Sequence, residues 1–434
     1  MLSTIGVSSV DDLFADIPPS VRATRFEVPP PLTEQEVRAE LGRLAARNAL
    51  PRISFLGAGA YRHLVPSVVG EVIGRSEFST SYTPYQPEVS QGTLQSIYEF
   101  QSLICELTGM EVATASHYDG ATATAEAALM ACRLTRRDRI AISSAVNPQV
   151  RRVVETYCSG PEIEVVVVPA DLAAGGSGLT GPDVAAGIVD AGFACLVAQQ
   201  PNFFGGVEPM RELAEAAHAV GAQLVAVVEP TSLALLQAPG DYGADIVAAE
   251  GQPLGIPLSY GGPYVGLMAA RMESVRQMPG RLVGATSDAQ GRRGYVLTLQ
   301  AREQHIRREK AASNICTNQA LCALAATTYL TAVGPEGLRE VAELSVTQTR
   351  HLAAAIEAAG LGERRFSCAY FAEVAIQLPG AARRHAELAR QGIVAGYLLE
   401  RDYPELRDTL LLAATELTRD EEIDAFVAAL GATP

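Results

Sequence analysis

The chain contains a single lysine, Lys310, although lysine and arginine together number 34, so the other 33 basic residues are arginines. A lysine amine is the side chain that forms a Schiff base with a carbonyl compound. Any mechanism of that kind in this chain therefore has one candidate residue. Lys310 ends a charged run at 301–310, and such a run predicts a solvated helix with supporting charge pairs four residues apart.

A strand is predicted at 245–249, and the residues that stand after it include Glu250, Gln252 and Pro253. In α/β sheets reactive side chains stand at the carboxyl ends of strands. None of these three residues forms a Schiff base. A plain glycine-rich connector remains open as the alternative interpretation.

The segment at 118–124 precedes an alanine-rich helix predicted at 121–134. Glycine and small hydroxyl residues at a helix N-terminus leave backbone N–H groups free to bind an anion. Capping of the helix by Asp119 or Thr122 explains the same residues. For this motif alone we favour capping.

Two further loops have polar residues at positions that suit binding. The loop at 81–92 carries two tyrosines and two prolines and leads into a helix predicted at 93–108, so it is either a binding loop on a rigid support or a turn that packs its tyrosines. A polar turn at 313–318 follows the charged run and indicates an interface or a phosphate contact. Its Cys316 has no evident paired base, so we do not expect it to be a nucleophile.

Composition excludes several classes of protein. The net charge of −15 and the pI near 5.0 argue against a nucleic-acid partner, which requires a basic surface. No apolar run reaches the roughly 18 residues of a membrane span, and the N-terminus lacks the pattern of a signal or transit peptide. The seven cysteines and six histidines show no metal-ligand or C-x-x-C spacing. We therefore expect a globular cytoplasmic protein without a bound metal or disulfide framework.

The order of predicted elements indicates three parts. Residues 1–50 read as an arm, with a short acidic helix near 9–15 and a second helix that starts at a capping box at Thr33 and runs to about Asn48. Residues 51–330 alternate strands and helices, which predicts a large, mostly parallel α/β sheet domain. Residues 331–434 predict a small C-terminal α+β domain that begins with a long helix at 335–359. The clearest strands are predicted at 139–143, 163–168, 195–198, 223–228 and 245–249, and the clearest helices at 121–134, 147–158 and 209–220.

Several long segments closely resemble one family, the alpha (N-terminal-type, or subunit 1) chain of the two-subunit glycine decarboxylase, which is the P-protein of the glycine cleavage system. They span most of the chain from about 82 to 322 and are far longer than a generic motif. The matching segments are Tyr82-Thr83-Pro84-Tyr85-Gln86-Pro87-Glu88, Tyr118-Asp119-Gly120-Ala121-Thr122, Gln200-Pro201-Asn202-Phe203-Phe204-Gly205, Gly243-Ala244-Asp245-Ile246-Val247, Ser259-Tyr260-Gly261-Gly262-Pro263-Tyr264, and the stretches at 104–110, 299–310 and 313–321.

The resemblance implies the aspartate-aminotransferase-like fold of pyridoxal phosphate enzymes (type I), with a large seven-stranded sheet domain, a small C-terminal domain and an N-terminal arm. It also implies a reaction in which glycine loses CO2 while pyridoxal phosphate acts as the electron sink. The remaining aminomethyl group passes to the lipoyl arm of the H-protein. In this family the beta chain, glycine dehydrogenase subunit 2, carries the cofactor lysine, and the expected assembly is an alpha2-beta2 heterotetramer.

The lysine count agrees with that division of labour. By resemblance, the lysine would stand near Gln252-Pro253, whereas Lys310 lies far downstream, and Glu229 falls where the fold usually puts the aspartate that pairs with the pyridine nitrogen. We therefore predict that this chain alone neither holds pyridoxal phosphate covalently nor decarboxylates glycine. The partner beta subunit would hold the cofactor.

We expect this chain to complete the site of its partner, and no catalytic residue is assigned within it. One group is predicted to contact the cofactor phosphate in trans: Ser313, Asn314 and Thr317. A second group is predicted to shape the glycine or lipoyl entrance: Tyr82, Tyr85, Gln86 and Glu88. Two alternatives stay open, a structural or regulatory subunit with an inactive pocket and an autonomous pyridoxal phosphate enzyme that uses Lys310.

Overall fold

The structure is a computed structural model of the chain, and it describes residues 1–434 except 24, 26, 316, 317 and 434. The chain divides into two compact units, Met1–Leu50 and Pro51–Pro434. No helix among the described residues is long and apolar enough to cross a membrane.

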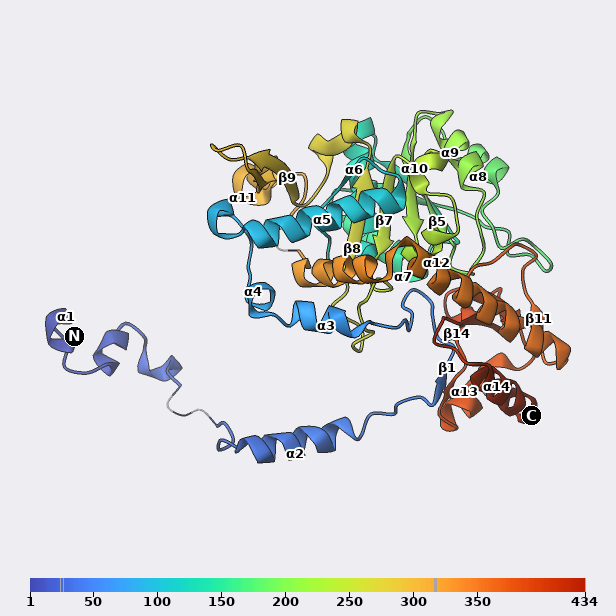
Figure 1. Ribbon diagram of the computed structural model, residues 1–434, viewed down its shortest axis with the longest axis horizontal. Helices are drawn as coiled ribbons and strands as arrows, with labels where there is room; N and C mark the ends of the chain where they lie inside the picture. The colour runs from blue at the N-terminus through green and yellow to red at the C-terminus, as the bar shows by residue number, and fades with distance from the viewer. Residues whose placement is uncertain (24, 26, 316–317, 434) are drawn as a thin grey trace. The chain divides into compact units, whose positions relative to one another are not determined.

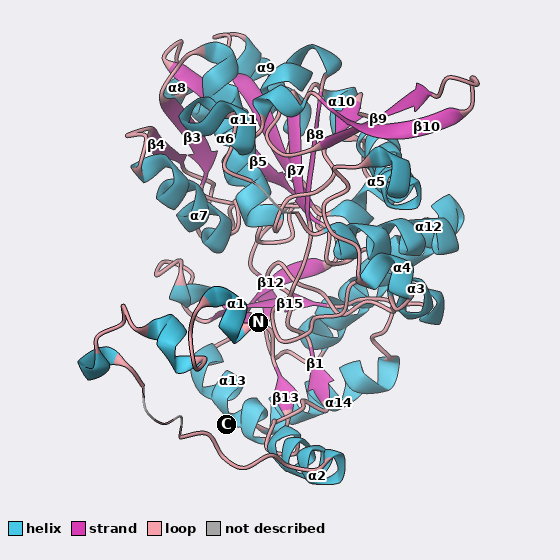
Figure 2. Ribbon diagram, turned by 90° about the vertical axis from the view of Figure 1, so that its left-hand side faces the viewer, coloured by secondary structure: helices cyan, strands magenta, loops and turns pink. Residues whose placement is uncertain are grey.

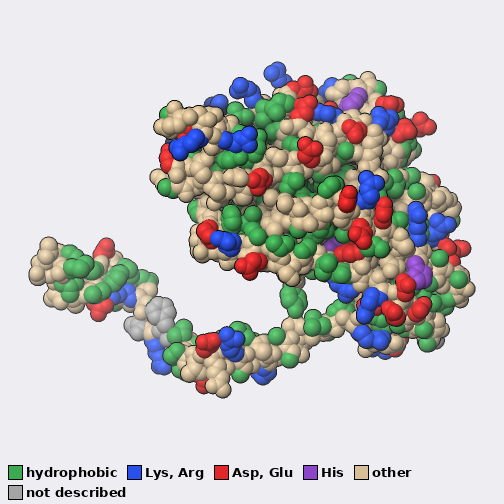
Figure 3. All heavy atoms as spheres, in the orientation of Figure 1, with side chains coloured by type: hydrophobic (Ala, Val, Ile, Leu, Met, Phe, Trp, Pro, Cys, Tyr) green, Lys and Arg blue, Asp and Glu red, His purple; other side chains and the backbone are tan. Residues whose placement is uncertain are grey.

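Met1–Leu50 contains short helical segments, and none of their described residues is buried. The capping box predicted at Thr33 is confirmed, because its hydroxyl accepts from the Glu36 N–H and the Glu36 carboxylate accepts from the Thr33 N–H. Hydrophobic side chains lie on the surface of this unit (Figure 3). The segments are α1 (Leu2–Ile5), η1 (Asp11–Phe14), η2 (Pro19–Val21) and α2 (Glu34–Ala45).

The larger unit is built on a seven-stranded sheet with the strand order β2-β8-β7-β6-β5-β3-β4 (Figure 1). β4, β3, β5, β6 and β7 are parallel, and β8 is antiparallel to both of its neighbours. The prediction of a mostly parallel sheet is confirmed. The strands are β2 (Val112–Ala113), β3 (Arg139–Ser143), β4 (Glu164–Val168), β5 (Phe193–Gln200), β6 (Gln223–Val228), β7 (Ile246–Glu250) and β8 (Gly266–Ala270).

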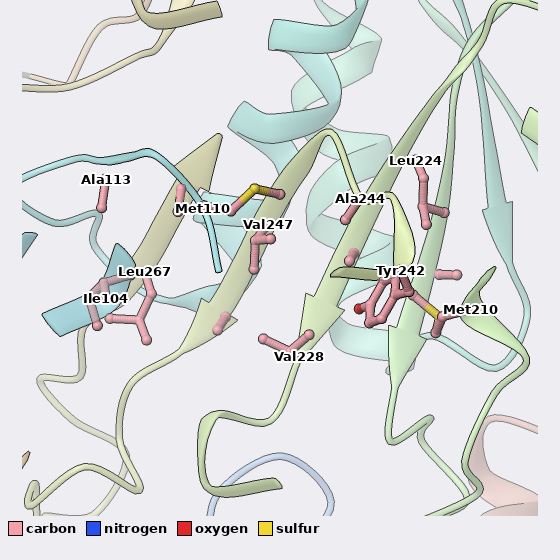
Figure 4. Close-up of a cluster of buried hydrophobic side chains, with 14 of the residues drawn as sticks. Ile104, Met110, Ala113, Met210, Leu224, Val228, Tyr242, Ala244, Val247 and Leu267 are labelled. Atoms are coloured by element: carbon pink, nitrogen blue, oxygen red, sulfur yellow. The ribbon is translucent and has the colours of Figure 1, made fainter. Parts of the chain in front are cut away.

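Helices cover both faces of this sheet, which explains why its central strands are continuously apolar. Alternate residues of β6 enter opposite clusters: Leu224 and Val228 pack on one face, and Val225 on the other. Figure 4 shows part of the first cluster, where side chains of β6, β7 and β8 meet Ile104 and Met210. The first face is covered by α5 (Gln91–Thr108), α9 (Met210–His218) and α12 (Ala320–Ala358), and the second by α6 (Gly120–Thr135) and α7 (Pro148–Ser159).

A second, four-stranded antiparallel sheet has the order β11-β12-β15-β14 (Figure 2). Its core is shared with the second half of α12, which begins at Pro335 after a break at Gly334, where φ is 63°. Proline is favoured at such a first helical position, in agreement with the predicted helix at 335–359. The elements are β11 (Glu363–Arg364), β12 (Glu373–Gln377), β14 (Tyr397–Leu398), β15 (Thr409–Ala413), α13 (Ala381–Arg390) and α14 (Asp420–Ala432).

Short elements complete the larger unit. β1 pairs in parallel with β13, although the two are more than 300 residues apart in the chain. β9 and β10 form an antiparallel hairpin that projects from the large sheet (Figure 2). The bounds are β1 (Ile53–Ser54), β9 (Leu282–Ser287), β10 (Arg293–Thr298), β13 (Ile393–Val394), α3 (Ser67–Ile73), α4 (Ser76–Ser79), α8 (Pro182–Ile188) and α10 (Pro239–Tyr242), with 3-10 turns η3 (Pro87–Val89), η4 (Pro230–Ala234), η5 (Met272–Gln277) and η8 (Leu399–Arg401). The domain boundary expected near residue 330 remains a prediction.

The continuous helix predicted for the charged run at 301–310 is wrong. The structure has three short turns there, η6 (Gln300–Arg302), α11 (Gln304–Arg307) and η7 (Arg308–Lys310). Leu299 and Arg308 have φ values of 52° and 53°, in a region that a right-handed helix does not use. Charge pairing four residues apart is too weak a preference to overcome such tertiary placement.

Candidate functional site

The carboxyl ends of β6 and β7 carry the polar residues that the sequence singled out. Glu229 follows β6, Glu250 is the last residue of β7, and Gln252 comes two residues later. Because the two strands are parallel neighbours, these side chains leave the sheet at the same edge. This edge is the place where an α/β fold binds a ligand.

Glu229 is half-buried and binds the turn that follows it. Its carboxylate accepts from the Thr231 N–H at 3.1 Å, the Thr231 hydroxyl at 2.6 Å and the Ser232 N–H at 2.8 Å. Burial raises the pKa of Glu229, while these hydrogen bonds oppose the rise. The carboxylate therefore caps η4.

Gln252 is 1% exposed and ties the strand end to the segment before α3. Its Oε1 accepts from the Tyr61 N–H at 2.8 Å, and its Nε2 donates to the carbonyls of Tyr61 at 2.9 Å and Ile256 at 2.8 Å. An amide has one acceptor and two donor hydrogens, so both ends of the side chain are occupied. Gln252 is a structural crosslink at the position where the family resemblance places a lysine.

Glu250 reaches from β7 to the start of α6. Its Oε2 accepts from the Gly120 N–H at 2.9 Å, and its Oε1 accepts from the N–H groups of Gln252 at 3.0 Å and Val265 at 3.3 Å. Burial raises the pKa of Glu250 to about 7 against the opposing effect of these bonds. Asp119 caps the same helix through the Thr122 N–H at 2.8 Å, so the capping favoured from the sequence is confirmed.

A cavity of about 20 Å³ lies beside Glu229 and is lined also by Tyr61, His63 and Glu373. A polar space of this size accommodates about one water molecule. The Glu373 carboxylate accepts from the Ala58 N–H at 2.6 Å and the Tyr61 hydroxyl at 2.7 Å. Burial raises the pKa of Glu373 to about 7, and the nearby Glu229 adds to the rise. The cavity is too small for a cofactor.

A larger cavity, about 250 Å³, joins three of the segments that the sequence singled out. The loop at 81–84 contributes Tyr82, the loop before β8 contributes Pro263, and the stretch before α12 contributes Asn318. Tyr82 is 78% exposed, and the predicted entrance residues Gln86 and Glu88 are exposed as well. The structure therefore brings the tyrosine loop and the polar turn to one hollow surface.

Tyr85, a residue of this loop that is 45% exposed, contacts a buried ion pair that the sequence did not reveal. Its hydroxyl accepts from Arg281 Nη2 at 2.9 Å, and the rings of Tyr85 and His305 pack in a T-shaped arrangement. Arg281 and Glu303 approach to 3.5 Å with side chains only 5% and 6% exposed. Arg281 precedes β9 without any local motif, so no sequence signal could have identified it.

The predicted phosphate-contact residues have different surroundings. The Ser313 hydroxyl donates to Glu126 Oε1 at 2.7 Å, inside the chain, whereas Asn314 is exposed. Asn318 donates to the Ser116 hydroxyl at 2.8 Å and so anchors the end of the turn. Thr317 and Cys316 lie outside the described residues.

Lys310 lines neither cavity, and among the described cysteines Cys322 lines the larger one. Lys310 is exposed on η7. Burial raises the pKa of the thiols of Cys132 to about 12 and of Cys158 to about 11, so these groups stay protonated. Among the described residues, no group of three or more His, Cys, Asp or Glu side chains is arranged to hold a metal ion.

Comparison with solved structures defines the class of protein. The chain superimposes on a sphingosine-1-phosphate lyase of Burkholderia pseudomallei with a TM-score of 0.70 at 17% identity, over 97% of this chain and 94% of that one. It superimposes on a glutamate decarboxylase of Lactobacillus brevis with a TM-score of 0.71 at 14% identity, over 95% of each chain. The fold is the type I, aspartate-aminotransferase-like fold of pyridoxal phosphate enzymes, as predicted.

Within that class, closer matches define the family. The family model described as glycine cleavage system P-protein matches residues 1–430. A probable glycine dehydrogenase (decarboxylating) subunit 1 of Moorella thermoacetica is 53% identical over 99% of this chain and 96% of its own, and one of Thermomicrobium roseum is 50% identical with the same coverage. A crystal structure of the glycine decarboxylase P-protein, in inhibitor-bound form, matches with a TM-score of 0.92 at 43% identity over 100% of this chain and 97% of that one. The chain belongs to the glycine cleavage system P-protein family.

The residues at this chain's own strand ends do not fit pyridoxal phosphate. Covalent attachment needs an amine, and the buried side chain after β7 is the amide of Gln252. A cofactor phosphate needs free N–H groups at a helix N-terminus, and the Gly120 N–H is bonded to Glu250. Neither group is available to the cofactor at this edge of the sheet.

Proposed function

We propose that this chain is an obligate subunit of glycine decarboxylase. It contributes residues that border the active site, whereas the partner chain binds the cofactor. A second chain, glycine dehydrogenase subunit 2, would hold pyridoxal phosphate on its own lysine, which makes the cofactor available as an electron sink. The observation that carries the proposal is Gln252, whose amide crosslinks backbone groups of Tyr61 and Ile256 at the expected lysine position. Family membership supports glycine as the substrate.

The 250 Å³ cavity is the proposed contribution to the partner's site. Its tyrosine loop would border the entrance for glycine and for the lipoyl arm of the H-protein, through Tyr82, Tyr85, Gln86 and Glu88. Tyr85 is set in place by Arg281, so the loop would meet the partner in one conformation. Such preorganisation reduces the entropy lost when two surfaces form a shared site.

For the trans phosphate contact, the geometry favours Asn314 over Ser313. A phosphate needs a donor, and the Ser313 hydroxyl proton is directed to Glu126. The exposed amide of Asn314 can donate to a group outside the chain. We retain Thr317 as a proposed contact on the basis of the family resemblance. The proposed assembly is an alpha2-beta2 heterotetramer in the cytoplasm.

The test is reconstitution of the purified chain with glycine dehydrogenase subunit 2. Each chain alone and the mixture are assayed for the exchange of the glycine carboxyl group with labelled bicarbonate in the presence of lipoylated H-protein. The proposal predicts activity only in the mixture. Activity of this chain alone would overturn it and would favour an autonomous enzyme that uses Lys310.

A structural or regulatory subunit is the second candidate, since the strand ends do not fit the cofactor. It is separated from the first by Tyr85→Ala and Asn314→Ala in the assembled complex. If the complex assembles normally and both variants keep wild-type glycine KM, kcat and cofactor affinity, the shared-site proposal fails and the structural role is favoured.

A further inference from the structure

The N-terminus of α6 in this chain is directed at a carboxylate of the chain itself. The first residue, Gly120, donates its N–H to Glu250 Oε2 at 2.9 Å. The N–H groups at the start of a helix and the helix dipole together favour a negative charge at this place. Glu250 provides that charge from the neighbouring strand β7.

Three separate pieces of backbone converge on this one carboxyl group. Gly120 belongs to α6, Gln252 follows β7, and Val265 precedes β8, yet the N–H of each is bonded to Glu250 at 2.9, 3.0 and 3.3 Å respectively. Each of these contacts is one in which the carboxyl oxygen accepts. That pattern is the one expected of an ionised carboxylate or of another oxyanion.

The surroundings leave little space for a second anion. A Cβ atom added to Gly120 would lie 2.7 Å from both the Cβ and the backbone nitrogen of Glu250, and one added to Gly266 would lie 2.3 Å from the Asp119 carbonyl oxygen. Glycine at these two positions allows the backbones of α6, β7 and β8 to approach one another closely. The place in which an anion could be bound is filled by protein.

We infer that Glu250 is a built-in anion that closes a phosphate cradle of this chain to ligands. The cradle is the place at the start of α6 towards which the N–H groups of Gly120, Gln252 and Val265 point. The consequence is that α6 is fixed against β7 and β8 in the absence of any cofactor. This inference concerns the chain by itself and does not depend on the proposed partnership, so either can fail without the other. It explains how a chain with this fold keeps its strand-end geometry without a bound phosphate group.

The test replaces Glu250 and asks whether inorganic phosphate takes its place. Glu250→Ala removes the carboxylate and leaves the three N–H groups without an acceptor, so its thermal midpoint falls by several degrees. Inorganic phosphate, titrated against sodium chloride at equal ionic strength, then raises the midpoint of the variant in a saturable way. The wild-type midpoint does not respond, because its cradle is already occupied.

Glu208→Ala is the matched control. Glu208 is buried. Like Glu250, it has a pKa raised to about 7 by burial and accepts from a backbone N–H, that of Thr180 at 2.9 Å. It does not face the start of a helix, since its other partners are the Thr180 hydroxyl and the Asn202 amide. The thermal midpoint of this control should fall, and phosphate should not raise it again.

Two results would overturn the inference. The first is that phosphate does not raise the thermal midpoint of Glu250→Ala, or raises it no more than it raises the midpoint of Glu208→Ala. The other is saturable stabilisation of the wild-type chain by phosphate, which would mean that the cradle is open. If Glu250→Ala does not fold, Glu250→Ser replaces it, because the serine hydroxyl can accept from part of the site. This variant is refolded in phosphate and in chloride. An equal yield of folded protein in the two salts also refutes the inference.

Discussion

Glu373 allows a quantitative test of how burial shapes the pH response of this chain. The perturbation is Glu373→Gln, which keeps the volume and the acceptor for the Ala58 N–H while removing the ionisable group. The Tyr61 hydroxyl, now a donor to Glu373, can rotate and accept from the new amide. The substitution therefore resembles the protonated state of the native carboxyl group.

The magnitude follows from the pKa shift. Burial raises the pKa of Glu373 from 4.5 to about 7 in the folded chain. A folded-state pKa above the unfolded one means that the associated stability is fully present below about pH 4.5 and is lost as the pH rises to about 7. At about 1.4 kcal/mol for each pKa unit, the free energy of unfolding falls by about 2.5 kcal/mol between pH 5 and pH 8 through this group alone.

The assay is urea unfolding of the wild-type chain and the variant at pH 5 and at pH 8. The free energy of unfolding of the wild type should fall between pH 5 and pH 8. The fall for Glu373→Gln should be smaller by about 2.5 kcal/mol. Burial also raises the pKa values of Glu208 and Glu250 to about 7. These two groups therefore preserve part of the pH dependence of stability in the variant. Glu215→Gln, at an exposed position of α9, is the control and should follow the wild type. A Glu373→Gln variant with the full wild-type pH dependence would refute the reasoning.

Four further substitutions test the roles assigned above. Gln252→Ala removes three buried hydrogen bonds to Tyr61 and Ile256 and should lower the free energy of unfolding by about 2–4 kcal/mol in urea titrations; an unchanged midpoint contradicts the crosslinking role. Lys310→Arg, on an exposed turn, should leave the activity of the assembled complex unchanged, and its loss would point to chemistry at Lys310. Asn314→Ala should weaken cofactor binding by the complex in spectroscopic titrations more than Ser313→Ala does, and the reverse order would show that the Ser313 hydroxyl is available after all.

The regular elements of the large sheet were predictable because their signals are local. The strand predicted at 223–228 is β6 to the residue, and the strand at 139–143 is β3. Continuous β-branched runs between amphipathic helices specify buried parallel strands without knowledge of their neighbours. The capping residues Thr33 and Asp119 were predictable for the same reason, since each bonds three positions along the chain.

The contacts between segments that lie far apart in the chain were not predictable. β1 pairs with β13 across more than 300 residues, and Gln252 binds a backbone segment 191 residues earlier. Nothing in either local sequence encodes its partner, because the pairing depends on how whole elements pack. Ser313 illustrates the limit. Its polar context indicated an external contact, whereas its hydroxyl donates a hydrogen bond to Glu126, 187 residues away. The charged run at 301–310 failed as a helix because tertiary placement of Leu299 and Arg308 outweighed local charge pairing.

In the proposed function, this chain completes a site whose cofactor is held by another chain. The most direct measurement is borohydride reduction of the reconstituted complex in the presence of pyridoxal phosphate, followed by peptide mass spectrometry of both chains. The account predicts a reduced cofactor adduct on a lysine of the partner and none on this chain. A stoichiometric adduct on Lys310, the chain's one lysine, would contradict it.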